Sequence, residues 1–364
     1  MPLLWSEDLG CGGALDAELL ARSEEAKRAL YAGQAYIVVP IYVTSICAEQ
    51  CLYCNYRAGN SGIAIQRKRL SDAELAREAA FVVEQFGLRA LELVYASDPG
   101  VTTDAMCRHV EVVSEVLERH GGGIVGLNAE SLEESDYRRL VDAGVSFSVV
   151  WQETYDASRY AMLHPGKRKK TSIEYRLDCY ERMLSAGMRH IGMGVLSGLA
   201  DWRHDWAMLL LHEEYLQQRY GRGAAILGIP RLKHAPGAVL HESDFIPSDR
   251  EFMAAVALHN IFSPETRAFI STREEWNLCL ELARGGGCLF TLNCATTPGG
   301  YSKPTAARQF KANSYSAPIY LPKLREAGLK PVLDWRLDAP DPLAAPVPAT
   351  TGRECTGSIS RTPE

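Results

Sequence analysis

Three cysteines lie close together near the start of the chain, at Cys47, Cys51 and Cys54. Their spacing, Cys-x3-Cys-x2-Cys, places three thiolates on one short segment. A closed structural zinc site needs four protein ligands, and a four-iron cluster is normally held by four cysteines. Three thiolates would leave one iron of such a cluster open to the oxygen and nitrogen donors of a small molecule. The spacing therefore predicts an incomplete metal site with a vacant position.

Two other interpretations of the three cysteines are unrelated thiols and one half of a zinc site. Neither a further Cys-x2-Cys pair nor a His-x3-His pair follows to complete a zinc site. The remaining cysteines are scattered, and we expect them to be buried or to have no role in the site. They are Cys11, Cys107, Cys179, Cys279, Cys288, Cys294 and Cys355.

Arg231 and Arg273 each follow an apolar run that reads as a strand. A guanidinium forms paired hydrogen bonds with a carboxylate, so these residues predict an acidic ligand such as an amino acid. The alternative for each is an ion pair with a structural Asp or Glu. The polar run 152–156 also follows a strand and exceeds what a turn needs.

The segment 192–199 is rich in glycine but lacks the spacing of a dinucleotide-binding fingerprint. Small residues there would allow a flat ring such as adenine to approach the backbone, and close packing within the fold is the competing explanation. His164 and the basic run 167–170 read as a solvated surface loop.

Strands and helices alternate along the chain, which predicts an α/β fold, a parallel (β/α)8 barrel. Apolar, β-branched runs predict buried strands at 35–43, 90–96, 123–128, 146–151, 190–196, 224–230, 267–273 and 288–292. Helical spacing predicts helices at 14–32, 71–87, 103–120, 132–143, 172–186, 203–219, 248–262 and 274–285. We expect an N-terminal helical extension over 1–34, the barrel over 35–335 and a flexible tail over 336–364.

The active site of such a barrel lies at the C-terminal ends of its strands. That rule selects 42–54, 96–98, 128, 152–155, 194–199, 230–231, 271–273 and 291–294. The formal net charge of −6 argues against a nucleic-acid partner. Neither a signal peptide nor an apolar run long enough to span a membrane is expected.

The cysteine run, with Tyr53 directly before the third cysteine, is similar to the signature of radical S-adenosylmethionine (SAM) enzymes. Within that superfamily, the chain resembles the aromatic amino acid lyase branch over roughly 35–335. This branch includes 2-iminoacetate synthase, the tyrosine lyase of hydrogenase maturation and the tryptophan lyase that forms 3-methyl-2-indolic acid. The matching segments are 152–156, Tyr160, 164–167, 175–177, 186–187, 192–203, 229–232, 297–301 and 330–335.

The resemblance implies that Cys47, Cys51 and Cys54 hold a [4Fe-4S] cluster that cleaves SAM to a 5′-deoxyadenosyl radical. It also implies that Arg176 meets the SAM carboxylate. The implied SAM-binding residues are Tyr53, Ser97, Asn128, Gln152, Glu153, Arg176, Gly194 and Leu196. The run 96–98, Ala-Ser-Asp, departs from the Gly-Glu element that receives the SAM amino group in the family.

For the substrate, the resemblance implies an aromatic amino acid, tyrosine or tryptophan, that loses a hydrogen from its amino nitrogen and then breaks a C–C bond. Arg273 and Tyr42 are the implied catalytic residues, and Thr291 and Arg231 join them in the predicted substrate site. An electron donor such as flavodoxin or ferredoxin is the implied partner. A cluster of this kind needs a reducing setting, so we expect a cytoplasmic protein.

Two other functions remain open from the sequence. One is a different radical SAM enzyme of cofactor or natural-product biosynthesis, and the other is a non-catalytic iron–sulfur protein. The tail carries a single cysteine, Cys355, so a second cluster of the hydrogenase-maturase type is not expected. The sequence does not decide between tyrosine and tryptophan.

Overall fold

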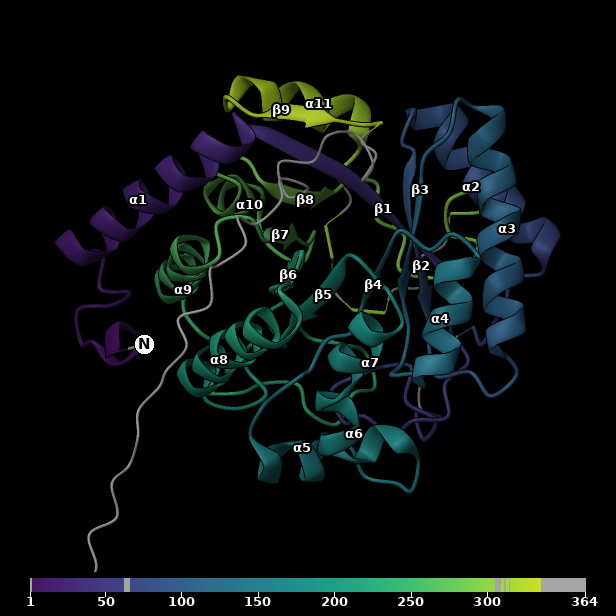
Figure 1. The fold of residues 1–364 in the computed structure, drawn as a ribbon, viewed down its shortest axis with the longest axis horizontal. Helices are drawn as coiled ribbons and strands as arrows, with labels where there is room; N and C mark the ends of the chain where they lie inside the picture. Colours follow the sequence, from purple (N-terminus) through teal and green to yellow (C-terminus); the bar gives the residue numbers. More distant parts are fainter. Residues whose placement is uncertain (1, 62–65, 305–308, 311, 314, 335–364) are drawn as a thin grey trace, which may run out of the picture.

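A computed structural model describes residues 2–334, except 62–65, 305–308, 311 and 314. In this part of the chain, eight parallel strands form a closed ring, in which each strand pairs with the next and β8 pairs with β1. Figure 1 shows helices around this ring. The strands are β1 (Gln34–Thr44), β2 (Ala90–Tyr95), β3 (Ile124–Asn128), β4 (Phe147–Val149), β5 (Ile191–Gly194), β6 (Ile226–Gly228), β7 (Arg267–Ile270) and β8 (Cys288–Thr291). The predicted (β/α)8 barrel is confirmed.

The helices follow the predicted order, with ends that differ by a few residues. They are α1 (Ala14–Tyr31), α2 (Asp72–Phe86), α3 (Thr103–Arg119), α4 (Glu134–Asp142), α5 (Ala157–Leu163), α6 (Ile173–Leu177), α7 (Cys179–Ser185), α8 (Trp202–Tyr220), α9 (Asp249–Phe262), α10 (Trp276–Leu282) and α11 (Ala317–Glu326). Helix α2 begins at a capping box, in which the side chains of Ser71 and Glu74 each accept a hydrogen bond from the other residue's backbone N–H. The helix expected over 172–186 is divided into α6 and α7.

The lower part of the barrel interior is filled by side chains that alternate along the strands. Tyr36 and Val38 of β1 pack there with Ala90, Phe147 and Leu289 from other strands. Because successive side chains of a strand point to opposite faces, the next inward positions lie toward the C-terminal ends. The packed layer therefore forms a floor, and the space above it is available to a ligand.

A short ninth strand and a last helix close the other end of the barrel. Strand β9 (Lys330–Val332) pairs with β1 over Gln34, Ala35 and Tyr36, and β2 pairs with β1 from Val39 onward. Figure 1 shows β9 and α11 together beside the start of β1. The sequence reading did not predict these two elements, and they lie at the end of the barrel opposite to the cysteines.

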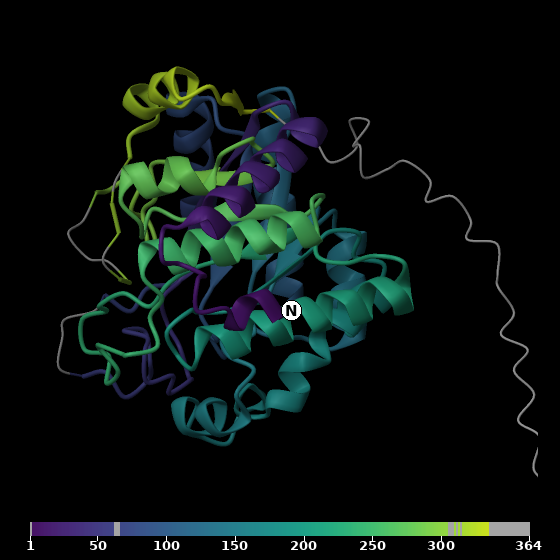
Figure 2. The same cartoon turned by 90° about the vertical axis from the view of Figure 1, so that its left-hand side faces the viewer.

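The N-terminal segment packs against the barrel. Helix α1 lies along α9 (Figure 2), and Leu19 of α1 belongs to the main hydrophobic core. Lys27 of α1 is buried and donates to the carbonyl oxygens of Pro264, at 2.9 Å, and Thr266. Among the described residues, no helix is long and apolar enough to cross a membrane. The predicted tail over 336–364 lies outside the described residues.

Candidate active site

A cavity at the C-terminal ends of the strands contains all three predicted cluster cysteines. The space between protein atoms there measures about 1130 Å³, part of it open to solvent, and we call it the cysteine cavity. Its polar or aromatic lining includes Tyr42, Cys47, Glu49, Cys51, Tyr53, Cys54, Arg57, Ser97, Asn128, Glu130, Trp151, Glu153, Lys170, Arg176, Arg273, Gln309 and Phe310. The barrel thus brings residues that follow all eight strands to one place.

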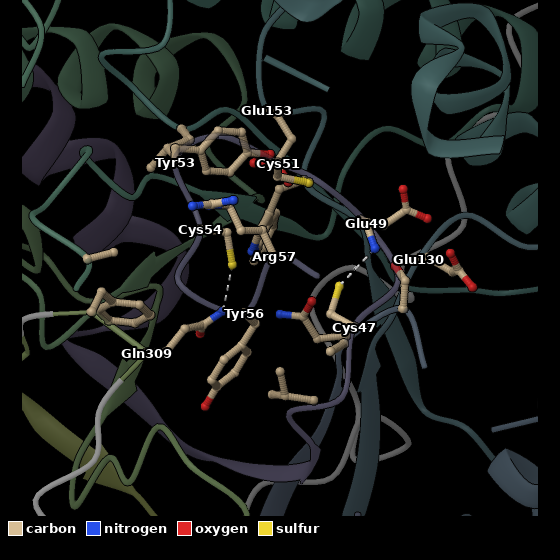
Figure 3. A pocket seen from close by; sticks show the side chains of 18 of the residues that line it. Cys47, Glu49, Cys51, Tyr53, Cys54, Tyr56, Arg57, Glu130, Glu153 and Gln309 are labelled. Atoms are coloured by element: carbon tan, nitrogen blue, oxygen red, sulfur yellow. Dashed lines mark hydrogen bonds between the residues drawn. The ribbon is translucent and has the colours of Figure 1, made fainter. Parts of the chain in front are cut away.

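The three cysteines lie on the loop that follows β1, and their sulfur atoms are distributed around the cavity (Figure 3). Among the described residues, no three His, Cys, Asp or Glu side chains converge on one metal-ion position. A cluster with several irons needs thiolates that are spread apart rather than directed at one point. The donor set therefore fits a cluster held by three thiolates.

Two of the sulfur atoms accept hydrogen bonds from the protein. Cys47 Sγ accepts from the Glu49 backbone N–H at 3.4 Å, and Cys54 Sγ accepts from Gln309 Nε2 at 3.7 Å (Figure 3). Burial raises the pKa of the Cys51 thiol to about 12, while the Lys170 ammonium opposes that shift. A metal cluster would stabilise the thiolate far more strongly than one ammonium group, and hydrogen bonds to sulfur tune such a cluster.

A buried charged group lies beside Cys51. The Glu153 carboxylate forms ion pairs with Lys170 at 3.3 Å and with Arg176 at 3.5 Å, and these three side chains are 5–14% exposed. Arg176 also donates twice to the Trp151 carbonyl oxygen, at 3.0 and 2.5 Å. Glu153 adopts a φ of 74°, a conformation that is strained for a residue with a side chain. Such strain is typical of functional sites.

Tyr53 is held by a short chain of hydrogen bonds. The nitrogen Nδ1 of His164 lies 2.8 Å from the Tyr160 carbonyl oxygen, which can accept but not donate. His164 Nδ1 is therefore the donor, and Nε2 accepts from the Tyr53 hydroxyl at 2.7 Å. Burial lowers the pKa of His164 to about 4, so the ring is neutral near pH 7. This contact fixes the ring of Tyr53 at the cavity wall.

Two residues of the segment 96–98, which departs from the family pattern, lie in different environments. The Asp98 carboxylate is held by Arg69, with contacts of 2.8 and 2.5 Å, by the Thr44 hydroxyl at 2.7 Å and by the Gly100 N–H at 2.9 Å. Asp98 does not line the cysteine cavity, whereas Ser97 does. The Asp98 carboxylate thus connects the loop after β2 to Thr44 of β1 and to Arg69.

A second, deeper cavity continues from the first one. This inner cavity is lined by Pro40, Tyr42, Glu92, Val94, Asn128, Trp151, Pro230, Phe269, Ser271, Arg273, Thr291, Cys294 and Phe310. Several of these residues, Arg273 and Tyr42 among them, line both cavities. The space between protein atoms in the inner cavity measures about 520 Å³, part of it open to solvent.

Arg273 has no acidic partner among the described residues. Its guanidinium lies 3.6 Å from the centre of the Phe310 ring, and burial lowers its pKa. The Tyr42 hydroxyl donates to Gln309 Oε1 at 2.8 Å, and the amide nitrogen of the same glutamine contacts Cys54. A cation without a carboxylate partner in a cavity is suited to an anionic ligand.

Arg231 differs from Arg273 in its surroundings. Its guanidinium binds the Glu274 carboxylate at 3.0 and 2.5 Å and Asp249 at 2.7 Å, and it donates to the Pro247 carbonyl oxygen at 2.9 Å. Arg231 lines neither cavity. These contacts agree with the alternative reading of Arg231 as a partner of structural carboxylates, so the structure does not bring it to the predicted substrate site.

The remaining predicted site residues divide between the cavity walls and the surrounding structure. Asn128 lines both cavities, Leu196 lines the cysteine cavity and Thr291 lines the inner cavity. Gln152 is fully buried outside both cavities. A Cβ atom on Gly194 would lie 2.3 Å from the Gly228 carbonyl oxygen, so close strand packing accounts for this glycine.

The basic loop after α5 was only partly interpreted correctly. Lys169 is solvent-exposed, but His164 is buried and Lys170 points into the cysteine cavity. The sequence reading also missed Gln309 and Phe310, because nothing in their local sequence marks them. Glu92 was missed although its position offered a signal, namely a carboxylate in the middle of an apolar strand.

Comparison with known proteins gives a consistent result, although no protein-family model matches the chain. The chain is 30% identical to 2-iminoacetate synthase of Escherichia coli (strain K12) over 326 residues, which cover 87% of this chain and 82% of that protein. It is 24% identical to the [FeFe] hydrogenase maturase subunit HydE of Thermotoga maritima, with 87% of each chain covered.

Among solved structures, the fold is similar to HydG, a maturase of the [FeFe]-hydrogenase. The TM-score is 0.84 at 28% identity, with 91% of this chain and 71% of that chain covered. HydG from Carboxydothermus hydrogenoformans has a TM-score of 0.80, also at 28% identity, over 90% of this chain and 75% of that one. On these grounds the chain belongs to the radical SAM enzymes related to 2-iminoacetate synthase and HydG, a family whose cofactors are a [4Fe-4S] cluster and SAM.

Proposed function

We propose that this enzyme is a carbon–carbon lyase that acts on an aromatic amino acid, tyrosine or tryptophan. The observation that carries the proposal is the position of Arg273. Its guanidinium, which has no acidic partner among the described residues, lines both the cavity of the cysteines and the inner cavity. An amino acid bound through its carboxylate at this arginine lies between the two cavities.

Cys47, Cys51 and Cys54 would hold the cluster, and SAM would bind against the wall formed by Tyr53, Ser97, Asn128, Glu153, Arg176 and Leu196. When bound, the cluster and SAM supply a 5′-deoxyadenosyl radical, for which an external donor such as flavodoxin or ferredoxin provides the electron. The proposed reaction begins with transfer of a hydrogen atom from the substrate's amino nitrogen to that radical. The resulting aminyl radical of the substrate would then break its Cα–Cβ bond, which releases the side chain as a radical and leaves dehydroglycine, or, with tryptophan, would transfer the carboxyl fragment to the indole ring.

The protein's contribution to this reaction is positional. Arg273 holds the substrate carboxylate, and stacking on Phe310 limits how far the guanidinium moves. The Tyr42 hydroxyl is fixed by Gln309, which also contacts Cys54, so the substrate wall and the cluster loop are joined by one side chain. This arrangement directs the amine toward the cysteine cavity and the side chain toward the inner cavity.

Apolar and aromatic groups make the inner cavity suitable for a ring. Trp151 and Phe269 contact each other edge-to-face, with ring centres 6.1 Å apart, and both line the inner cavity. Val94 and Pro40 complete the wall toward β1 and β2. Aromatic rings pack favourably in such edge-to-face arrangements, which supports an aromatic substrate over a short aliphatic one.

A product assay tests the proposal. The enzyme is reconstituted with iron and sulfide without oxygen, reduced with dithionite and supplied with SAM and either tyrosine or tryptophan. We expect 5′-deoxyadenosine together with p-cresol from tyrosine, or with an indole acid from tryptophan. Absence of 5′-deoxyadenosine would indicate a non-catalytic iron–sulfur protein. If 5′-deoxyadenosine forms but neither amino acid is consumed, the substrate belongs to another class.

Matched cysteine variants provide the control for this assay. Cys51→Ser removes a proposed cluster ligand, so the iron content and the 5′-deoxyadenosine should both be lost. Cys179 is also buried, with 0% of its surface exposed against 5% for Cys51, but it lies outside the cavity, on α7. Cys179→Ser should therefore retain both, which separates loss of the cluster from a general loss of folding.

A further inference from the structure

Glu92 of β2 is a carboxylate in the interior of the barrel, and the proposed reaction gives it no role. The residue is 1% exposed and lines the inner cavity. One side-chain donor reaches it, Asn128 Nδ2 at 3.3 Å, and no Lys, Arg or His in the described part of the chain forms an ion pair with it. Burial raises its pKa to about 7. A buried carboxyl with so few partners is costly unless a ligand completes its hydrogen bonds.

The strand register places Glu92 at the bottom of the inner cavity. Glu92 lies opposite Pro40 of β1, and Val94 lies opposite Tyr42. Glu92 is thus one inward-facing layer below Val94, which corresponds to about 6.6 Å along the strand. Ala90, the next inward residue below, already belongs to the packed floor. The carboxylate therefore lies between the apolar floor and the free space of the cavity.

The two cavities share lining residues, so the cysteines, Arg273 and Glu92 follow one another from the first cavity into the second. The three cysteines line the cysteine cavity, Arg273 lines both cavities, and Glu92 lines the inner cavity. A substrate held by its carboxylate at Arg273, with its amine toward the cysteines, extends its side chain toward Glu92.

We propose that Glu92 accepts a hydrogen bond from the O–H or N–H group at the far end of the substrate's aromatic ring. This inference rests on the proposed function, and it makes Glu92 a specificity-determining residue. The enzyme then selects tyrosine or tryptophan and rejects phenylalanine, which has no donor on its ring. A site built around a buried polar group discriminates strongly against a ligand that leaves the group unpaired.

Calorimetric binding to the cluster-reconstituted enzyme, with SAM present and without reductant, tests the proposal independently of turnover. The ligand pairs are L-tyrosine with L-phenylalanine and L-tryptophan with 1-methyl-L-tryptophan. In at least one pair, the ligand with the donor should bind about 5- to 150-fold more tightly, because the other ligand leaves a buried carboxyl group without its hydrogen-bond partner. Equal affinities within both pairs would overturn the proposal.

Variants of Glu92 separate its role from that of the rest of the cavity. In the ligand pair that the wild type discriminates, Glu92→Leu should reduce the ratio of the two dissociation constants to about one. Glu92→Gln keeps a carbonyl acceptor and should retain most of this affinity ratio. Glu130 lines the cysteine cavity and not the inner one, so Glu130→Gln should leave the ratio unchanged. An unchanged ratio in Glu92→Leu refutes the role of Glu92. If Glu92→Leu does not fold, the affinity ratio of the wild-type enzyme tests the proposal, and equal affinities within both ligand pairs refute it.

The outcomes also distinguish this inference from the proposed function. If all four ligands bind but the donor makes no difference, the aromatic amino acid remains the substrate class and the role of Glu92 is wrong. If none of the four binds, the proposed substrate class itself is wrong, and the inference fails with it.

Discussion

Two arginines at neighbouring strand ends allow a matched pair of substitutions, Arg273→Met and Arg231→Met. Arg273 has no carboxylate partner among the described residues, while Arg231 is bound by Glu274 and Asp249. Methionine has a similar length and no charge, so each variant removes the charge while the volume changes little. Arg231→Met should therefore lower the stability and leave the substrate affinity nearly unchanged, whereas Arg273→Met should lower the affinity and leave the stability nearly unchanged.

The contacts set the expected magnitudes. Removing Arg231 leaves Glu274, which is 4% exposed, with Lys233 at 2.9 Å as its remaining cation. Breaking a buried ion pair in this way costs about 3–5 kcal/mol of unfolding free energy. Removing Arg273 breaks no ion pair, and it removes a charged group whose burial is unfavourable, as its lowered pKa indicates. The unfolding free energy should therefore change by less than about 1 kcal/mol.

Substrate affinity should respond in the opposite way. Arg273→Met leaves the substrate carboxylate unpaired, at a cost of about 2–5 kcal/mol, or roughly 30- to 5,000-fold in Kd. Arg231→Met should leave Kd within a few-fold, since Arg231 lines neither cavity. Thermal unfolding and calorimetric binding of tyrosine and tryptophan measure both quantities. Equal destabilisation by the two variants would show that Arg273 is structural, and unchanged affinity in Arg273→Met would refute its role as the carboxylate clamp.

Three further substitutions test other parts of the site. Lys170→Met removes the cation that lies beside the cluster loop and pairs with Glu153, so the midpoint potential of the cluster should become more negative. A redox titration monitored by EPR measures this potential, and an unchanged value would contradict the prediction. Asp98→Asn weakens the contacts to Arg69 and should lower the melting temperature without loss of iron, whereas loss of iron would point to a direct role in the site. Glu92 has a folded-state pKa of about 7 against 4.5 in the unfolded chain, so the folded state binds more protons between these values, and unfolding free energy should fall as pH rises through this window. Glu92→Gln should flatten that slope in chemical denaturation at pH 4.5–7, and an unchanged slope would contradict the raised pKa.

Most of the barrel could be predicted because its strands are buried on both faces and read as continuous apolar runs. The run before the cysteines and the run that became β8 are examples, and both lie within a residue or two of the observed strands. Three elements were missed, the short helix α5, helix α11 and strand β9. Strand β9 has Pro331 in its middle, which argues against a central strand, and its pairing depends on the free edge of β1 rather than on its own sequence.

The candidate site was predictable where one segment carries several functional groups. The cysteine loop is such a segment, and its three thiols lie around one cavity as the spacing indicated. Arg231 and Arg273 could not be told apart from sequence, because the difference depends on Glu274 and Asp249, which come together through the fold. The position of Lys170 in the cavity likewise depends on its pairing with a distant strand end.

The central claim is that the radical is directed at the amino nitrogen of an aromatic amino acid held by Arg273. Hydrogens on nitrogen exchange with solvent, whereas those on Cα and Cβ do not exchange on the same timescale. The most direct measurement is therefore the mass of 5′-deoxyadenosine formed from unlabelled tyrosine or tryptophan in D2O. One deuterium in 5′-deoxyadenosine is the predicted result, and 5′-deoxyadenosine without deuterium would contradict the account.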